Sequence, residues 1–262
     1  MVSPILPPGL VYHPADIKAY EVGLAGHNGD PVPAYVARPS AEGQYPGLIL
    51  VHGVHGYEEH MKDVARRFAA LGYAAIVPAL YSRNEFLAVV EEEDLSQAAG
   101  WLTARPHAQA NGDLLAGQNF LESSSFVNGR IGLVGFCSGG RVALMFACNT
   151  QRLAAFLNFY SNGVFQPTEA NPVTAGEMVG GLCCPMLGLF GADDTNPSPA
   201  DVERLRQELQ NHGKTCKTTA RLSRRRVSKT RVTLSFPTPA PATGPRRLTW
   251  RGAVAWSGFP AI

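Results

Sequence analysis

Long apolar runs and nucleotide-binding glycine motifs are both absent from this chain of 262 residues. No apolar stretch reaches the roughly 18 residues that a membrane-spanning helix needs, so we expect no membrane partner. The N-terminus has no basic start followed by a continuous apolar stretch, which argues against a signal peptide. Neither G-x-G-x-x-G nor G-x-x-x-x-G-K-[ST] occurs, so no dinucleotide or P-loop site is predicted, and we expect no cofactor.

Cysteine is scarce, and its spacing excludes two kinds of site. The five cysteines are residues 137, 148, 183, 184 and 216. An odd count without metal-ligand spacing predicts neither a disulfide framework nor a zinc site, and it favours the reducing cytoplasm. His52 and His55 have no third ligand near them in the sequence, so we expect solvated loop histidines and no metal. Apart from Cys137, we expect the cysteines to fill the core.

Acidic residues are absent after Glu208. The last 54 residues hold 11 of the 23 Lys and Arg, whereas all 21 Asp and Glu lie earlier. The Pro, Arg, Thr and Gly content after Gly213 is typical of a disordered segment or of loose strands. We therefore divide the chain into a globular domain, residues 1–213, and a basic tail, residues 214–262. The tail lacks the regular aromatic spacing of single-strand binders, so we expect no nucleic-acid partner.

Short apolar runs alternate with helical patterns between residues 18 and 213. Two β runs within residues 18–39, joined at Asn28-Gly29, predict a hairpin. Buried strands are expected at 47–51, 74–77, 131–134, 153–160 and 185–190, and helices at 58–71, 88–102, 113–123, 139–148 and 198–210. Asp113 and Ser198 are the expected caps of their helices. This order predicts an α/β protein with a doubly wound, mostly parallel sheet and helices on both faces.

The sequence GFCSGG, residues 135–140, places a cysteine between two glycines where an expected strand meets an expected helix. This spacing is typical of the nucleophile elbow of α/β-hydrolases, a sharp turn in which larger neighbours would clash with backbone. We therefore expect the α/β-hydrolase fold, with Cys137 as the nucleophile. The backbone N–H of Ser138 is the first expected oxyanion donor. Many free cysteines are merely buried apolar residues, but the strand-turn-helix context favours the nucleophile.

Two loops after other expected strands supply further candidates. The first, HGVHG at residues 52–56, is rich in glycine, and the N–H of Val54 is the expected second oxyanion donor. The second, FGADD, ends in Asp193 and Asp194. Because Ser198 already caps the following helix, we expect one of these aspartates to orient a catalytic histidine.

Residues 18–213 resemble the dienelactone hydrolase family, the carboxymethylenebutenolidase-like α/β-hydrolases. The resemblance rests on DVARRFAALGYAAIVPALYSR at 63–83, IGLVGFCSGG at 131–140 and LFGADDTNPSP at 189–199. It implies that Cys137 is the nucleophile and Asp194 the triad acid, with Val54 and Ser138 as the oxyanion hole.

The resemblance also implies two substrate-binding residues. Arg83, after the Leu80-Tyr81 pair, would help to bind a substrate carboxylate, and Tyr160 would lie near the pocket. The alternatives are a solvated surface position for Arg83 and packing at a strand end for Tyr160.

The chain departs from the family pattern at two places. A glutamate that commonly interacts with the resting cysteine is replaced by Gly53. The triad histidine is expected about 30 residues after the acid, yet RLSRRRVSK at 221–229 contains none, and no histidine follows His212. The altered composition coincides with this loss, so we hypothesise a changed reading frame near residue 215, which sequencing of the locus tests.

Two functions remain open. The first is hydrolysis of small carboxylic esters or lactones, dienelactone-like, by an esterase with a cysteine nucleophile. The second is a catalytically impaired relative that lacks the triad histidine but keeps ligand binding or a reactive thiol. The sequence does not assign an oligomeric state.

Overall fold

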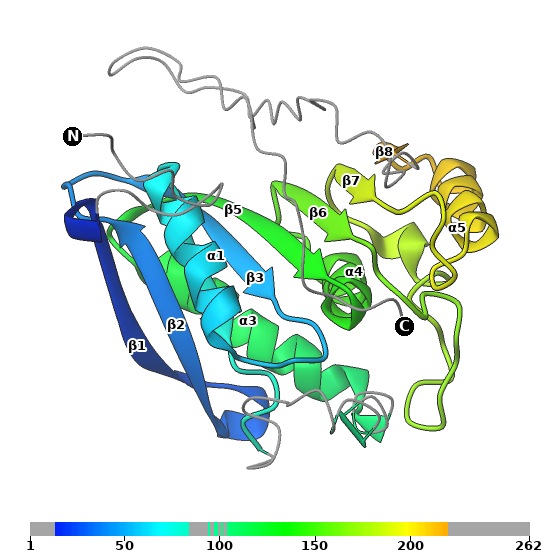
Figure 1. The fold of residues 1–262 in the computed structure, drawn as a ribbon, viewed down its shortest axis with the longest axis horizontal. Coiled ribbons are helices and arrows are strands. Elements are labelled where there is room, and N and C mark those ends of the chain that lie inside the picture. The colour runs from blue at the N-terminus through cyan, green and yellow to red at the C-terminus, as the bar shows by residue number, and fades with distance from the viewer. Residues whose placement is uncertain (1–13, 84–93, 95–96, 99–100, 102–103, 220–262) are drawn as a thin grey trace, which may run out of the picture.

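An eight-stranded sheet forms the centre of the protein, with the strand order β1-β2-β4-β3-β5-β6-β7-β8 (Figure 1). The computed structural model describes residues 14–83, 94, 97–98, 101 and 104–219. The strands are β1 Ile17–Ala25, β2 Pro31–Pro39, β3 Tyr45–Val51, β4 Ala74–Pro78, β5 Val127–Phe136, β6 Ala155–Phe159, β7 Met186–Leu189 and β8 Cys216–Thr219. Strand β2 is antiparallel to β1 and β4, whereas the other neighbours are parallel. The expected doubly wound sheet is confirmed.

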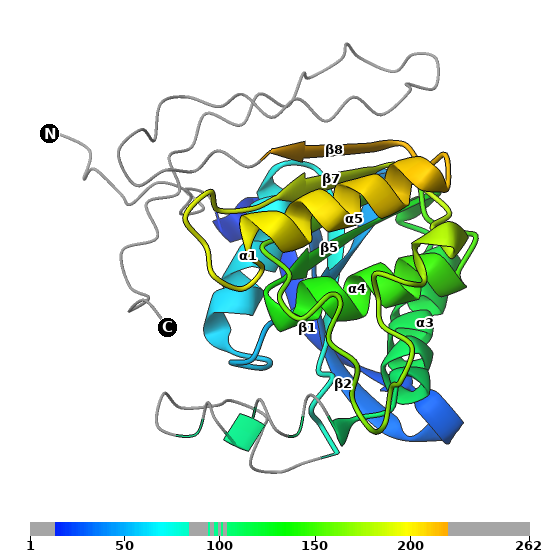
Figure 2. The same cartoon turned by 90° about the vertical axis from the view of Figure 1, so that its right-hand side faces the viewer.

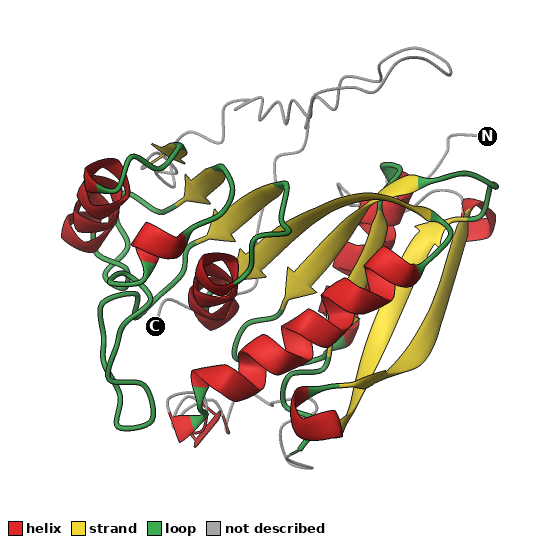
Figure 3. Cartoon of the chain, turned by 180° about the vertical axis from the view of Figure 1, so that it is seen from behind, coloured by secondary structure: helices red, strands yellow, loops and turns green. Residues whose placement is uncertain are grey.

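Helices cover both faces of this sheet. Helix α1, Glu59–Ala70, buries Met61, Ala65 and Ala69 against one face, together with side chains of β2, β3 and β4. Helices α3 (His107–Ser123), α4 (Ser138–Asn149) and α5 (Pro199–Asn211) contribute to the core on the other face. Figure 3, seen from behind, shows α3 and α4 in front of the strands, and Figure 2 shows α1 on the opposite side from α3. None of the helices in the described residues is long and apolar enough to cross a membrane.

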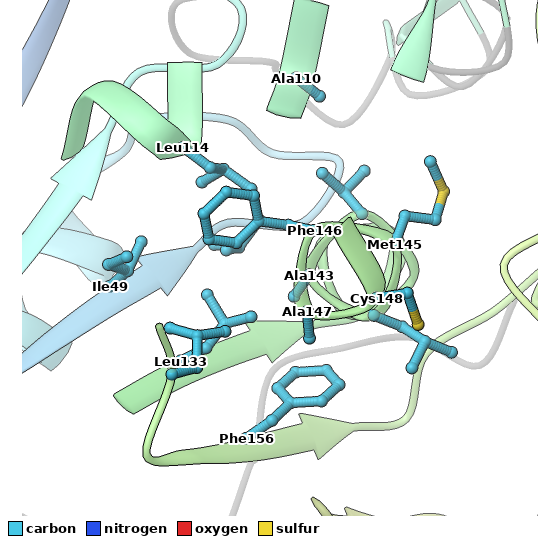
Figure 4. Close-up of a cluster of buried hydrophobic side chains, with 14 of the residues drawn as sticks. Ile49, Ala110, Leu114, Leu133, Ala143, Met145, Phe146, Ala147, Cys148 and Phe156 are labelled. Carbon is cyan, nitrogen blue, oxygen red and sulfur yellow. The ribbon is translucent and has the colours of Figure 1, made fainter. Parts of the chain in front are cut away.

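The larger core surrounds α4. Ala143 and Ala147 of this helix lie over Leu133 of β5 and Phe156 of β6 (Figure 4). Phe156 and Leu133 have no exposed surface, and full burial of such a side chain stabilises a fold by about 1.5–3 kcal/mol. Cys148, at the end of the same helix, is also buried, as expected for a core-filling cysteine.

Two local signals in the sequence are confirmed. Asn28 and Gly29 both have positive φ, 56° and 81°, in the turn of the β1–β2 hairpin. The Ser198 side chain accepts a hydrogen bond from the N–H of Asp201, and the Asp201 carboxylate accepts one from the N–H of Ser198. This capping box starts α5 one residue later, at Pro199.

The expected start of α3 is wrong by six residues. The helix begins at His107, and Asp113 lies inside it with no exposed surface. Its carboxylate accepts hydrogen bonds from Arg83 and from the backbone N–H of His27, so it is not available as a cap. An aspartate that resembles a cap in the sequence is therefore a buried ion-pair partner, a distinction that only distant residues make.

The sheet continues beyond the expected end of the globular domain. Strand β8 pairs in parallel with β7, with Met186 beside Cys216 and Leu189 beside Thr219. Residues 216–219, assigned to the tail from the sequence, thus extend the sheet. The helix expected at 88–102 falls mostly outside the described residues, and the tail from residue 220 falls wholly outside them.

Candidate functional site

The carboxyl ends of β3, β5, β6 and β7 meet at one edge of the sheet. In the register, Val51 lies beside Gly135, and Phe159 lies between Phe136 and Leu189. The loops that leave these strands carry Val54, Cys137, Tyr160 and Asp194. Ligands of open parallel sheets bind at this edge, so the topology gathers most of the expected site residues there.

Cys137 occupies a strained turn between β5 and α4. Its φ and ψ are 55° and −129°, and its N–H donates to the carbonyl oxygen of Phe159 at 3.0 Å. A Cβ on Gly139 would lie 2.1 Å from the carbonyl oxygen of His52, and one on Gly135 would lie 2.7 Å from the Cβ of Ala143. Both flanking glycines are therefore required by close packing, which is the steric reason expected for an elbow.

Opposing influences act on the pKa of the Cys137 thiol. Burial, the largest, raises its pKa, and the negative charge of Asp194 acts in the same direction. Hydrogen bonds from the backbone N–H groups of Ser138 and Val54 act in the opposite direction. The pKa stays above that of an ordinary cysteine, so the thiol is protonated at neutral pH. Both expected oxyanion donors lie against the sulfur, where they could stabilise a developing negative charge.

Two buried rings, those of Tyr81 and His52, hold the loop that carries Val54 in place. The Tyr81 hydroxyl donates to the carbonyl oxygen of Gly53 at 3.0 Å. The His52 ring packs edge-on against Tyr81, with the ring centroids 4.5 Å apart. Tyr81 was missed in the sequence, although it lies directly after β4 within a segment on which the family resemblance rests.

His52 is buried, contrary to the solvated position expected for it. Its Nε2 accepts from the N–H of Leu80 at 3.1 Å, and its Nδ1 lies 3.0 Å from the carbonyl oxygen of Gly53. Burial lowers its pKa to about 4, so the ring is neutral and donates through Nδ1. Both ring nitrogens are thus used in holding the loop. Within the described residues, no group of three His, Cys, Asp or Glu side chains is arranged to hold a metal ion.

The segment that follows β6 also lies close to Cys137. Tyr160 has a φ of 39°, which is costly for a residue with a side chain, and its N–H donates to the carbonyl oxygen of Leu189 at 2.8 Å. Burial raises the pKa of its hydroxyl, and the charge of Cys137 adds to this effect. The amide nitrogen of Asn162 lies 3.7 Å from the Cys137 sulfur and donates to it. No motif in the sequence pointed to Asn162.

Arg83 lies in a network of carboxylates. Its Nε donates to Asp30 at 2.6 Å, and its two terminal nitrogens donate to the two carboxylate oxygens of Asp113 at 2.7 and 2.9 Å. The guanidinium is thus neither freely solvated nor available for a further carboxylate in this arrangement.

The match to known proteins agrees with this geometry. The model of the dienelactone hydrolase family matches residues 32–220. This chain belongs to the dienelactone hydrolase family. The match includes β8 and ends seven residues beyond the expected limit of the resemblance at residue 213.

Relatives of known name share about a third of their residues with this chain. "Putative carboxymethylenebutenolidase" of Methylorubrum extorquens is 32% identical over 187 residues, which are 71% of this chain and 64% of the relative. The protein of the same name from Escherichia coli K12 is 33% identical over 192 residues, 70% of this chain and 67% of the relative. The crystal structure of "Putative Dienelactone Hydrolase" from Klebsiella pneumoniae superposes with a TM-score of 0.71 at 30% identity, covering 78% of this chain and 85% of that one. The alignment thus spans less than two thirds of the Methylorubrum protein's length.

The histidine implied by the family resemblance is not among the groups that act most strongly on Cys137, which are Ser138, Val54 and Asp194. His212 is exposed at the end of α5, where its ring lies against Gly180. Because α5 follows β7 and runs back along the sheet, its end lies at the edge opposite the elbow (Figure 2). The stretch 221–229, where the family histidine is expected, lies outside the described residues.

Proposed function

We propose that this chain hydrolyses carboxylic ester or lactone bonds of small, dienelactone-like molecules through Cys137. The observation that carries the proposal is the convergence of the Val54 and Ser138 N–H groups on a cysteine sulfur at an elbow. Membership of the dienelactone hydrolase family supports the reaction class. The five free cysteines further support a reducing compartment such as the cytoplasm.

The proposed reaction has two stages. The Cys137 sulfur attacks the carbonyl carbon, and the resulting oxyanion is stabilised by the N–H groups of Val54 and Ser138, each worth about 3–4 kcal/mol in comparable sites. The C–O bond to the leaving group breaks, the leaving oxygen takes up a proton, and a thioester remains. Water then attacks the thioester, which releases the carboxylic acid and restores the thiol.

Three further residues have proposed supporting roles. Asp194 would orient the base that takes the Cys137 proton. Tyr160, with its strained backbone beside the elbow, would form a wall of the pocket. Binding of a substrate carboxylate by Arg83 would require an exchange of its present partners Asp30 and Asp113.

A second candidate is an impaired homologue that keeps a reactive thiol or ligand binding without efficient turnover. The observation in its favour is the environment of Cys137. Burial raises the pKa of the thiol, and among the described residues no imidazole is one of the groups that act most strongly on it. Loss of one triad member can cost several orders of magnitude in rate.

Hydrolysis of a chromogenic ester and of a dienelactone by wild type and Cys137→Ala tests the first function. We expect turnover by wild type that is lost in the variant. If wild type is inactive but an alkylating agent labels Cys137, the second candidate is correct. Added imidazole should then accelerate hydrolysis by wild type and leave Cys137→Ala at the rate of the imidazole-containing buffer.

A further inference from the structure

Cys137 has a hydrogen-bond donor from the side chain of another loop as well as donors from the backbone. The amide nitrogen of Asn162 lies 3.7 Å from the Cys137 sulfur and donates to it. Asn162 is partly buried, in the segment that follows β6. A thiolate accepts hydrogen bonds more strongly than a thiol, since bonds to an ionised acceptor are the stronger ones. A donor at this place therefore favours the ionised form of the nucleophile.

The two backbone donors near the sulfur have a second task in the proposed reaction. The N–H groups of Val54 and Ser138 act on the Cys137 thiol in the resting protein. Once the carbonyl carbon has been attacked, the same two groups would hold the oxyanion. An N–H that binds the oxyanion is no longer free to donate to the sulfur. The Asn162 amide comes from a different loop and lies against the sulfur itself, so it can stay there while the oxyanion forms.

Hydrogen bonds on both sides of Asn162 fix its backbone. The N–H of Tyr160 donates to the carbonyl oxygen of Leu189, at the end of β7, at 2.8 Å. The N–H of Gly163 donates to the side-chain oxygen of Asn196 at 3.2 Å. Gly163 also has a φ of 62°, in the left-handed region that favours glycine. The side chain of Asn162 is thus directed at the sulfur by a backbone that is held before and after it.

The partner of Gly163 belongs to the loop of the proposed triad acid. The N–H of Asn196 donates to a carboxylate oxygen of Asp194 at 3.2 Å, while its side chain accepts from Gly163. A chain of hydrogen bonds therefore joins Asp194, through Asn196, to the loop that carries Asn162. The loop that would orient the base and the donor on the sulfur are held in one arrangement.

Charged groups from other elements also act on the nucleophilic thiol. The negative charge of Asp194, after β7, raises the pKa of the thiol. The positive charge of Arg141, on α4, interacts favourably with the thiolate. Tyr81 and Tyr160 are neutral at pH 7, because burial raises the pKa of both hydroxyls. Asn162 carries no charge, so its hydrogen bond should act on the sulfur at high salt as well, where exposed charges are screened.

We infer that Asn162 is a further catalytic residue, a side-chain donor that stabilises negative charge on the Cys137 sulfur, and that Asn196 is its positioning residue. The amide acts twice in the proposed reaction. It favours the thiolate when the sulfur gives its proton to the base and attacks the carbonyl carbon. After water has added to the thioester, the C–S bond breaks, and the amide stabilises the sulfur as it leaves with the electron pair. These two steps rest on the proposed function, but the donor itself can be tested without turnover.

Alkylation of Cys137 by iodoacetamide from pH 6 to pH 10 tests the inference. The thiolate displaces iodide and forms an S–CH2 bond, so the rate, followed by mass spectrometry of the peptide, rises with the thiolate fraction. Asn162→Leu removes the donor at similar volume. We expect its midpoint to rise by about half to one pH unit, with a roughly three- to tenfold slower reaction at pH 7. Thiolate absorbance in the ultraviolet, taken as the difference from the same protein with Cys137→Ala, measures the midpoint independently of reagent access.

Further variants separate the donor from its surroundings. Asn162→Asp replaces the donor with a negative charge in nearly the same shape and should raise the midpoint more than Asn162→Leu. Asn196→Ala removes the acceptor of the Gly163 N–H and should shift the midpoint in the same direction by a smaller amount. Asn149→Leu is the matched control, because this amide donates to the carbonyl oxygen of Met145 at the far end of α4. It should leave the midpoint unchanged, and the shift in Asn162→Leu should persist in molar salt.

The outcomes separate the inference from the proposed function. Equal midpoints in wild type, Asn162→Leu and Asn162→Asp would overturn the donor while leaving Cys137 as the nucleophile, and so would an equal shift in Asn149→Leu. The expected shifts in a wild type that turns over no ester would support the donor and overturn the proposed hydrolysis. If Asn162→Leu does not fold, as judged by circular dichroism, the comparison of Asn162→Asp with wild type decides the question. Where wild type is active, kcat/KM in Asn162→Leu should fall by about the same factor as the alkylation rate.

Discussion

A Cβ atom on Gly53 would lie 3.2 Å from the Cβ of Cys137 and 3.9 Å from its sulfur. Any side chain at this position therefore contacts the nucleophile. The resemblance to the family implies a glutamate here, and its absence leaves the thiol without an adjacent carboxylate from this loop. The relationship between these two residues gives the first prediction.

Gly53→Glu should slow the alkylation of Cys137 by iodoacetamide at pH 7 by at least about tenfold relative to Gly53→Gln, because an adjacent negative charge raises the pKa of the thiol. The two variants have nearly the same shape, so their comparison isolates the charge. Gly23→Ala in β1, where a Cβ meets nothing within 4 Å, controls for a glycine substitution as such. Equal rates for Glu and Gln would show that residue 53 does not face the sulfur.

Asp194→Asn should lower the pKa of Cys137, because the aspartate charge raises it. The rate of alkylation by iodoacetamide, measured from pH 6 to pH 10, should show a midpoint at lower pH than in wild type. Asp193→Asn changes the exposed neighbouring residue and should leave the profile in place. A shift of the pH profile in Asp193→Asn and not in Asp194→Asn would show that Asp193, and not Asp194, is the acid of the site.

Arg83→Gln should destabilise the fold, because it leaves the fully buried carboxylate of Asp113 without its ion-pair partner. We expect the free energy of unfolding, from urea titrations, to fall by about 3–5 kcal/mol. The double variant Arg83→Gln/Asp113→Asn should recover part of this loss. Arg206→Gln, which breaks an exposed pair with Glu203, should cost less than about 1 kcal/mol. A stable Arg83→Gln protein with weakened binding of anionic esters would favour the substrate role instead.

His52 should make the fold sensitive to mild acid. Burial lowers its pKa to about 4 in the folded protein, whereas the unfolded value is about 6.5. Between these values the unfolded chain binds a proton that the folded chain does not, so the free energy of unfolding decreases as the pH falls. The loss amounts to roughly 3 kcal/mol once the pH reaches about 4.

Urea titrations at a series of pH values between 7.5 and 4 measure this dependence. His52→Gln removes the titration and should flatten the curve over this range, with the remaining slope including that of His107. His212→Gln, at the exposed end of α5, is the matched control and should keep the wild-type slope. An unchanged slope in His52→Gln would show that His52 is not buried as a neutral ring.

The sequence by itself determined the hairpin turn, the cap at Ser198 and the elbow. Each of these depends on local chemistry: Asn28-Gly29 adopts positive φ easily, Ser198 caps a helix with its own neighbours, and the glycines beside Cys137 are required by a turn of fixed geometry. The spacing of short apolar runs also determined the parallel sheet, because strands buried on both faces have no polar side.

Only the tertiary structure decided which charged residues are neutralised and which are not. Arg83 and Asp113 are 30 residues apart in the chain and form an ion pair. Asp113 has the sequence pattern of a helix cap, but in the fold it is a buried ion-pair partner inside α3. Segments that lie far apart in the sequence decide which side chains are buried and which are paired. A linear sequence pattern therefore does not show either property.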